Sequence, residues 1–170
     1  MKLAPKITII MVAIVGVVLS LCGFAMISSN FNRSYKEAIA HNTSVHLSTK
    51  DSIKRFFATS FYSGKEVVDL EIAAYALQMT EHLSSQNDSL AILSERKSTL
   101  YSNLPGEFSR NIKTTIFEAE QPSYQFYRFN GVTYIAMSSR VLTADRQLWL
   151  ISVFDVTSLF VERRVQLYTF

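Results

Sequence analysis

Three histidines, His41, His46 and His82, are the residues of this sequence best suited to proton or phosphoryl transfer. A phosphate-accepting histidine is expected to precede an acidic residue and, shortly afterwards, a proline. These three precede Asn or Leu and have no proline nearby. His41 and His46 are five residues apart, a poor spacing for one helical face, so a zinc site is not supported. We therefore expect all three side chains on helix surfaces, without a catalytic role.

Other groups with catalytic potential are isolated from partners. Ser94 stands three residues before Lys97, but the charged run between them is typical of a solvated helix face. Glu118 and Glu120 share one strand face, which indicates edge charges rather than an acid/base pair. A nucleotide site needs glycine-rich backbone near the phosphates, and the glycines are scattered along the chain: Gly16, Gly23, Gly64, Gly106 and Gly131. We expect no enzymatic activity, no metal and no cofactor.

Four residues are candidates for binding a ligand: Tyr127, Arg128, Tyr134 and Arg140. An inward arginine could hold a carboxylate with two hydrogen bonds, and a tyrosine could fix its orientation. The simpler interpretation is that the arginines face solvent from an antiparallel sheet with one wet side. Trp149 and Phe154 fall on opposite faces of one strand, so one belongs to the core and the other contacts a helix or a partner.

These residues follow a membrane-sized segment. Residues 7–28 are 22 consecutive uncharged, mostly apolar residues, which as a helix reach ~33 Å, enough to cross a hydrocarbon core of ~30 Å. Lys2 and Lys6 precede the segment, so the positive-inside rule predicts residues 1–6 in the cytoplasm and the rest outside. Arg33 and Lys36 oppose this orientation, but they begin a long domain, and long domains cross largely regardless of charge.

The same segment has a competing interpretation as a cleaved signal peptide. Gly23 and Ala25 are small residues at a plausible cleavage spacing, although the segment is longer than an ordinary signal-peptide core. Cys22 is a weak candidate for lipidation, because Leu21 stands where a small residue is expected. A retained anchor is the interpretation we favour.

Beyond the anchor, the composition is that of an ordinary globular domain. Apart from Lys2 and Lys6, 15 Lys and Arg stand against 14 Asp and Glu, and no basic patch interleaved with aromatic residues indicates nucleic acid. The one cysteine, Cys22, lies in the apolar segment, which excludes a disulfide framework in the domain that follows.

The first part of this domain is predicted to be helical. A long helix should continue from the anchor to about Ser60, loosened near residues 42–44, with Ile53 and Phe57 among its apolar positions. Residues 63–66 match a capping box that opens a second helix, whose apolar stripe is Val67, Leu70, Ala74, Leu77 and Leu83. A third helix is predicted over residues 89–104, with Leu90, Leu93, Leu100 and Tyr101 inward, before Pro105-Gly106 and a short amphipathic piece carrying Phe108 and Ile112.

After Lys113 the pattern predicts strands. Residues 114–118, 124–129, 132–139 and 146–156 are rich in Ile, Val, Tyr, Phe and Thr. Asn130-Gly131 is a strong hairpin signal, and Ala144-Asp145 marks a second reversal. The expected fold is α+β: one transmembrane helix, a helical segment and an antiparallel sheet of three or four strands. Residues 157–170 then form a juxtamembrane helix with an apolar stripe of Val161, Val165 and Tyr168.

The order of these parts resembles the front end of bacterial two-component sensor histidine kinases. The detailed likeness lies in LWLISVFDVTSLFVERRVQLYTF, residues 148–170, where a last strand, an Asp-Val-Thr-x-Leu-Phe link and a charged helix resemble the approach to a second membrane span. The resemblance implies a PAS-like or Cache-like sensor domain over residues 29–156, a small-molecule or peptide ligand, and a homodimer. It departs from the family in lacking the second span and the transmitter module. Chemoreceptors and cyclic-dinucleotide synthases carry similar domains, and a singly anchored surface binding protein remains the alternative.

Overall fold

The computed structural model describes residues 3–62, 67–83, 88–106, 108, 123–143 and 146–169. The chain divides into two compact units, one formed by Met1–Ala38 with Ser158–Phe170 and the other by Ile39–Thr157. The first unit contains the apolar part of helix α1 (Leu3–Tyr62) and nearly all of helix α4 (Thr157–Thr169). The second contains the rest of α1, helix α2 (Asp69–Leu83) and the sheet, so the fold is α+β.

Helix α1 runs for 60 residues without a break. It contains the only helix segment in the described residues that is long and apolar enough to cross a membrane, with a mean hydropathy of 2.7. The loosening expected at residues 42–44 is absent from this helix. The Thr43 hydroxyl donates a hydrogen bond to the Ile39 carbonyl 2.7 Å away. This polar side chain therefore bonds within the helix and does not interrupt it.

Five antiparallel strands form one sheet in the order β2-β1-β5-β4-β3. Their bounds are β1 Ser89–Ser94, β2 Thr99–Ser102, β3 Ser123–Phe129, β4 Val132–Leu142 and β5 Gln147–Asp155. The predicted meander is confirmed by β3, β4 and β5, while the strand predicted over residues 114–118 lies outside the described residues. Asn130 and Gly131 have φ values of 49° and 83°, the positive angles that a two-residue type I′ hairpin requires.

The helix predicted over residues 89–104 was wrong, because this segment is the hairpin of β1 and β2. The four middle residues of β1, Leu90 to Leu93, are all buried, since both faces of this strand are covered. A continuous apolar run has neither a strand's alternation nor a helix's period, and its periodicity cannot separate the two. Lys97, with φ of 61°, lies in the turn that follows.

The stripe predicted for the second helix was also wrong in its orientation. Leu70 is 79% exposed and Leu77 52% exposed, whereas the buried face of α2 contains Ile72, Ala76 and Thr80. An isoleucine, an alanine and a threonine at i, i+4 and i+8 form the buried face, whereas the leucines on which the predicted stripe rested are exposed. Residues 63–66, the predicted capping box, lie outside the described residues, but α2 begins only at Asp69, so the prediction that they open this helix was wrong.

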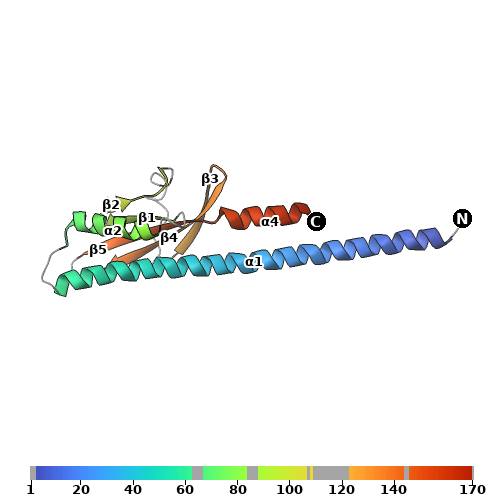
Figure 1. Ribbon diagram of the computed structural model, residues 1–170, viewed down its shortest axis with the longest axis horizontal. Helices are drawn as coiled ribbons and strands as arrows, with labels where there is room; N and C mark the ends of the chain where they lie inside the picture. Colours follow the sequence, from blue (N-terminus) through green and yellow to red (C-terminus); the bar gives the residue numbers. More distant parts are fainter. Residues whose placement is uncertain are drawn as a thin grey trace. The chain divides into compact units, whose positions relative to one another are not determined.

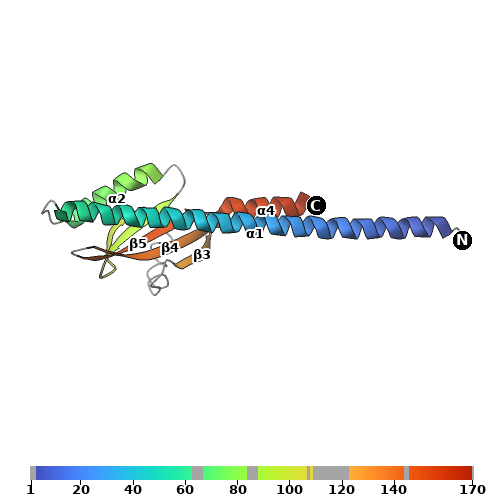
Figure 2. The ribbon, with the colours of Figure 1, turned by 90° about the horizontal axis from the view of Figure 1, so that it is seen from below.

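The core of the second unit has two parts, one on each face of the sheet. One face, which we call the helix-covered face, packs against α1 and α2. Figures 1 and 2 show the second half of α1 lying along the strands on this side. Its cluster comprises Ile53, Phe57, Val67, Ile72, Ala76, Leu90, Ile92, Val141, Leu148 and Leu150. The cluster on the opposite face comprises Ala91, Leu93, Phe108, Ala136, Trp149, Ile151 and Val153.

The middle strand β5 contributes to both clusters. Trp149 and Phe154 lie on opposite faces of it, as predicted, and each is only 3% exposed. Seven consecutive residues of β5 are buried, so this strand is the centre of the domain.

Within the first unit, α4 packs against α1 through aromatic residues. The ring of Phe160 lies 5.7 Å from that of Phe31, and the Arg163 guanidinium carbon lies 4.4 Å from the Phe31 ring centroid. Val161 and Val165, the predicted apolar stripe, are 50% and 59% exposed, while the side chain of Tyr168 lies outside the described residues.

Candidate functional site

The structure brings together two of the four predicted ligand-binding residues. Tyr127 in β3 is directly opposite Tyr134 in β4, and both half-buried rings lie on the face away from α1. Both tyrosines meet the fully buried Phe108 ring edge-on, with centroids 5.4 and 5.1 Å apart. Phe129 joins this aromatic cluster at 5.1 Å from Phe108. The tyrosines thus belong to one packed group.

The two arginines are separate from this aromatic cluster. Arg128 pairs with Thr133 on the opposite face of the sheet and is exposed. Arg140 shares the face of Tyr134 but lies six residues further along β4, where its guanidinium carbon is 4.9 Å from the Trp149 ring centroid. No single group in the described residues therefore combines a predicted arginine with the tyrosine pair.

The half-buried rings of Tyr127, Phe129 and Tyr134 present a partly exposed aromatic surface with a few polar atoms. Tyr127 donates a hydrogen bond from its hydroxyl to the Gln125 side-chain oxygen at 2.7 Å. The neighbouring Ala136 is fully buried in the same cluster. Such a surface can hold an apolar or planar group and orient it through a phenol hydroxyl.

A concave feature runs along α1. It is a shallow groove of about 670 Å³, lined by Ala40, Thr43, Ser44, Leu47, Ser48, Asp51, Ser52 and Arg55. Its side chains are mostly small and polar, and it offers no apolar pocket for a ligand. In the first unit, α1 and α4 enclose a space of only about 30 Å³, roughly the volume of one water molecule.

The most unusual polar group is the imidazole of His46, which was predicted to lie on a helix surface. His46 in α1 is completely buried, which makes the prediction of a surface histidine wrong at this position. Its Nδ1 lies 2.8 Å from Oγ of Ser152 in β5, and its Nε2 lies 3.0 Å from Oγ of Ser139 in β4. Burial, and to a smaller extent the positive charge of Lys50, lowers the pKa of His46 from its ordinary value of 6.5 to about 4.

The other two histidines differ from His46. His41 is exposed, as predicted, and the side chain of His82 lies outside the described residues. The charge of His41 affects the pKa of Asp88, the residue that directly precedes β1. Partial burial raises the pKa of Asp88 to about 6, against the lowering effect of His41.

The buried histidine lies on a helical face that is visible in the sequence only when polar positions are counted together with apolar ones. Asn42, His46, Thr49, Ile53 and Phe57 follow the spacing of a single helical face, and all five are buried. Because three of the five are polar, a search for apolar periodicity detects only the second part of this face.

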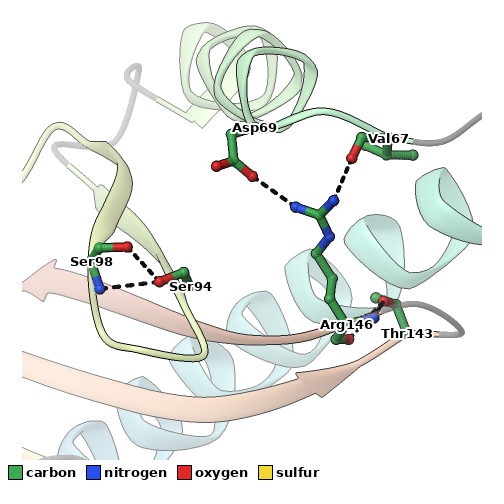
Figure 3. Close-up of polar contacts among 6 residues, drawn as sticks. All are labelled: Val67, Asp69, Ser94, Ser98, Thr143 and Arg146. Atoms are coloured by element: carbon green, nitrogen blue, oxygen red, sulfur yellow. Dashed lines mark hydrogen bonds and ion pairs between the residues drawn. The ribbon is translucent and has the colours of Figure 1, made fainter.

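The remaining polar contacts are structural. Arg146, just before β5, donates one hydrogen bond to Asp69 at 2.7 Å and another to the Val67 carbonyl at 2.8 Å (Figure 3). This side chain fastens the start of α2 to the sheet. The hydroxyl of Ser94, the serine three residues before Lys97, forms hydrogen bonds with Ser98 across the β1–β2 turn, as Figure 3 also shows.

Neither a metal site in the described residues nor a similarity to known proteins adds to what the fold shows. Among the described residues, no three His, Cys, Asp or Glu side chains converge as metal ligands. No known family model matches the chain, and no curated protein is significantly similar to it. The coarse class that the fold defines is an α+β domain joined to an apolar, membrane-sized helix.

Proposed function

We propose that this chain is the extracytoplasmic signal-sensing part of a membrane-bound sensor protein of the two-component histidine kinase type. The observation that carries the proposal is the connection of the sheet to its two long helices. Helix α1 contains both the apolar segment and the face that packs on the sheet, and only Val156 separates β5 from α4. The sheet is therefore connected along the chain to the apolar segment through α1 and to α4 through Val156.

The connection between β5 and α4 is well fixed. The Val156 amide donates to the Thr133 carbonyl at 2.9 Å, and the Thr133 amide donates to the Thr157 hydroxyl at 2.9 Å. The Asp155 carboxylate accepts a further hydrogen bond from the Thr157 amide at 2.9 Å. These bonds support rigid transmission, because a shift of β4 against β5 moves the first residue of α4.

The ligand in this proposal binds at the aromatic cluster of Phe108, Tyr127, Phe129 and Tyr134. The rings suit a small molecule or peptide with an apolar or planar part, and the sensor acts as a homodimer with a second copy in the same membrane. Arg140, which shares the face of Tyr134, remains a candidate for an acidic group if a ligand extends along the sheet, whereas Arg128 lies on the other face.

The test is a signalling chimera. Residues 1–170 are joined in frame to the second span and transmitter of a well-characterised sensor kinase, and kinase output is measured in cells while small metabolites are screened. We expect output to respond to at least one compound, and Tyr134→Ala to reduce that response at least tenfold without changing protein level. Arg128→Ala, on the other face, is the matched control and should respond normally. Binding of the compound to the purified chain without any response in the chimera would favour a singly anchored binding protein.

A further inference from the structure

The face of α1 that packs on the sheet consists of two chemically different halves. Between residues 42 and 49 its buried side chains are polar, namely Asn42, His46 and Thr49. At residues 53 and 57 they are Ile53 and Phe57, which belong to the apolar cluster of the helix-covered face. The apolar half gains from the removal of its side chains from water, whereas in the polar half His46 hydrogen-bonds to the sheet and Thr49 donates to the Val45 carbonyl within the helix.

His46 is the centre of the polar half. A neutral imidazole has one nitrogen that donates and one that accepts, so one serine hydroxyl accepts from His46 and the other donates to it. The two serines come from adjacent strands, β4 and β5, and this single side chain therefore joins α1 to both.

The surroundings of His46 do not compensate a positive charge. From α1 the charged group that acts on it is Lys50, which carries the same sign. The strand residues on the facing side are Ser139 and Met137 of β4 and Leu150 and Ser152 of β5, none of which titrates. Among the described residues, no carboxylate contributes to the pKa of His46. An imidazolium here could still donate to both serines, but it would lose its hydration without gaining an ion pair.

We propose that His46 is an acid-sensitive latch: protonation of its imidazole releases the 42–49 half of α1 from β4 and β5, while Ile53 and Phe57 keep the other half packed. This inference concerns the chain itself and holds whether or not the chain signals through a kinase.

The size of the effect follows from linkage. With a pKa of about 4 when latched and 6.5 when released, lowering the pH from 7 to 5 should shift the equilibrium toward release by about 20-fold. Asp88 titrates in the same interval with a pKa raised to about 6, so its contribution has to be separated.

The test measures how accessible the interface is to a thiol reagent. The full chain in nanodiscs, with Cys22→Ala, carries one new cysteine at buried Thr49, and its reaction with dithiodipyridine is followed at pH 7 and pH 5. Rates are divided by those of Ser48→Cys, an exposed neighbour on the same helix, to remove the pH dependence of thiol chemistry. We expect the normalised rate to rise about 20-fold at pH 5.

Matched variants assign the effect to one residue. His46→Gln, which cannot take up a proton in this range, should abolish the rise, whereas His41→Gln and Asp88→Asn should retain it. Ile53→Cys should show less than a threefold rise, because the apolar half stays packed. A full rise in His46→Gln, no rise in the parent, or an equal rise at Ile53→Cys would each refute the latch. If His46→Gln does not fold, NMR titration of the parent decides, since a His46 midpoint near 6.5 would also refute it.

Discussion

The Nε2 atom of His46 in α1 lies 3.0 Å from Oγ of Ser139 in β4, inside an interface where neither residue is accessible to solvent. Helices usually pack on sheets through apolar side chains, and in the described part of α1 that packs on the sheet the buried apolar side chains are Ile53 and Phe57. The histidine–serine contact makes the attachment of α1 directional and dependent on protonation.

The stability of the domain should decrease on acidification because of His46. Its folded-state pKa is depressed, so its contribution is fully present above pH 6.5 and is lost as the pH falls toward 4. The loss should reach about 3 kcal/mol of unfolding free energy at pH 4. The check is denaturant unfolding from pH 7 to pH 4 in an Asp88→Asn background, because the raised pKa of Asp88 acts in the opposite direction. His46→Gln should flatten the curve, and a parent curve with no slope below pH 6.5 would contradict the assignment.

Removing the indole of Trp149 should strongly destabilise the sheet. The side chain is 3% exposed in the central strand and packs in the cluster opposite α1, so Trp149→Ala should cost on the order of 3–5 kcal/mol. Leu142→Ala, at a position 65% exposed on the neighbouring strand, should change stability by less than about 0.5 kcal/mol. Thermal unfolding of both variants measures the difference, and equal melting temperatures would show that the indole is not part of the core.

The β3–β4 hairpin should depend on its two turn residues. Asn130 has φ of 49°, which a β-branched side chain tolerates poorly, so Asn130→Val should cost about 1–2 kcal/mol. Asn130→Gly supplies the same angle without a side chain and should be nearly neutral. Hydrogen exchange of the β3 amides provides a local readout. If valine left their protection unchanged, the turn would not control the pairing of these strands.

Arg146 should be worth more than an ordinary surface arginine. Its two hydrogen bonds to Asp69 and the Val67 carbonyl hold the start of α2, so Arg146→Met should cost about 1–2 kcal/mol and loosen α2 in preference to the sheet. Asp69→Asn removes only the charge of an exposed partner and should cost about 0.5 kcal/mol or less. Proteolysis near residue 67 would report the loosening. Equal effects of the two substitutions would mean that the Val67 carbonyl contact is unimportant.

The proposed orientation predicts that the sheet lies outside the cytoplasm. Lys2 and Lys6 precede the apolar segment, so single cysteines at the exposed positions Glu95 and Asn130, with Cys22→Ala, should react with a membrane-impermeant maleimide in intact cells. Lys2→Cys should react only after the cells are lysed. Mass spectrometry of the same protein tests retention of the anchor, because a cleaved signal peptide would shorten the chain. Labelling of Asn130→Cys only in lysed cells would reverse the topology.

How far the sequence predicts this fold depends on whether a segment has one wet face. The strands β3, β4 and β5 carry β-branched and aromatic residues, Asn130-Gly131 joins the first two, and all three were predicted correctly. Strand β1 is covered on both sides, so its apolar run lacks alternation and resembled a helix. Its pairing with the distant β5 is a tertiary contact that local patterns do not encode.

The candidate sites were harder to predict for a different reason. Tyr127 and Tyr134 lie opposite one another because the hairpin fixes the register of β3 and β4, and their role in binding a ligand stays a prediction. Arg128 and Arg140 were placed with them by proximity in sequence, although the pleat sends Arg128 to the other face. His46 was assigned to the surface because its residue type is polar. Only the serines of two strands, more than 90 residues away, make its burial favourable.

The position of β5 at the middle of the sheet also determines how the domain bears mechanical load. A pull on α4 along the strand direction passes through Val156 directly into β5, which is bonded to β1 on one side and to β4 on the other. Both ladders are then loaded in shear, so their hydrogen bonds must break together rather than one by one. Tension applied at α4 should therefore be transmitted across the sheet before the sheet unfolds.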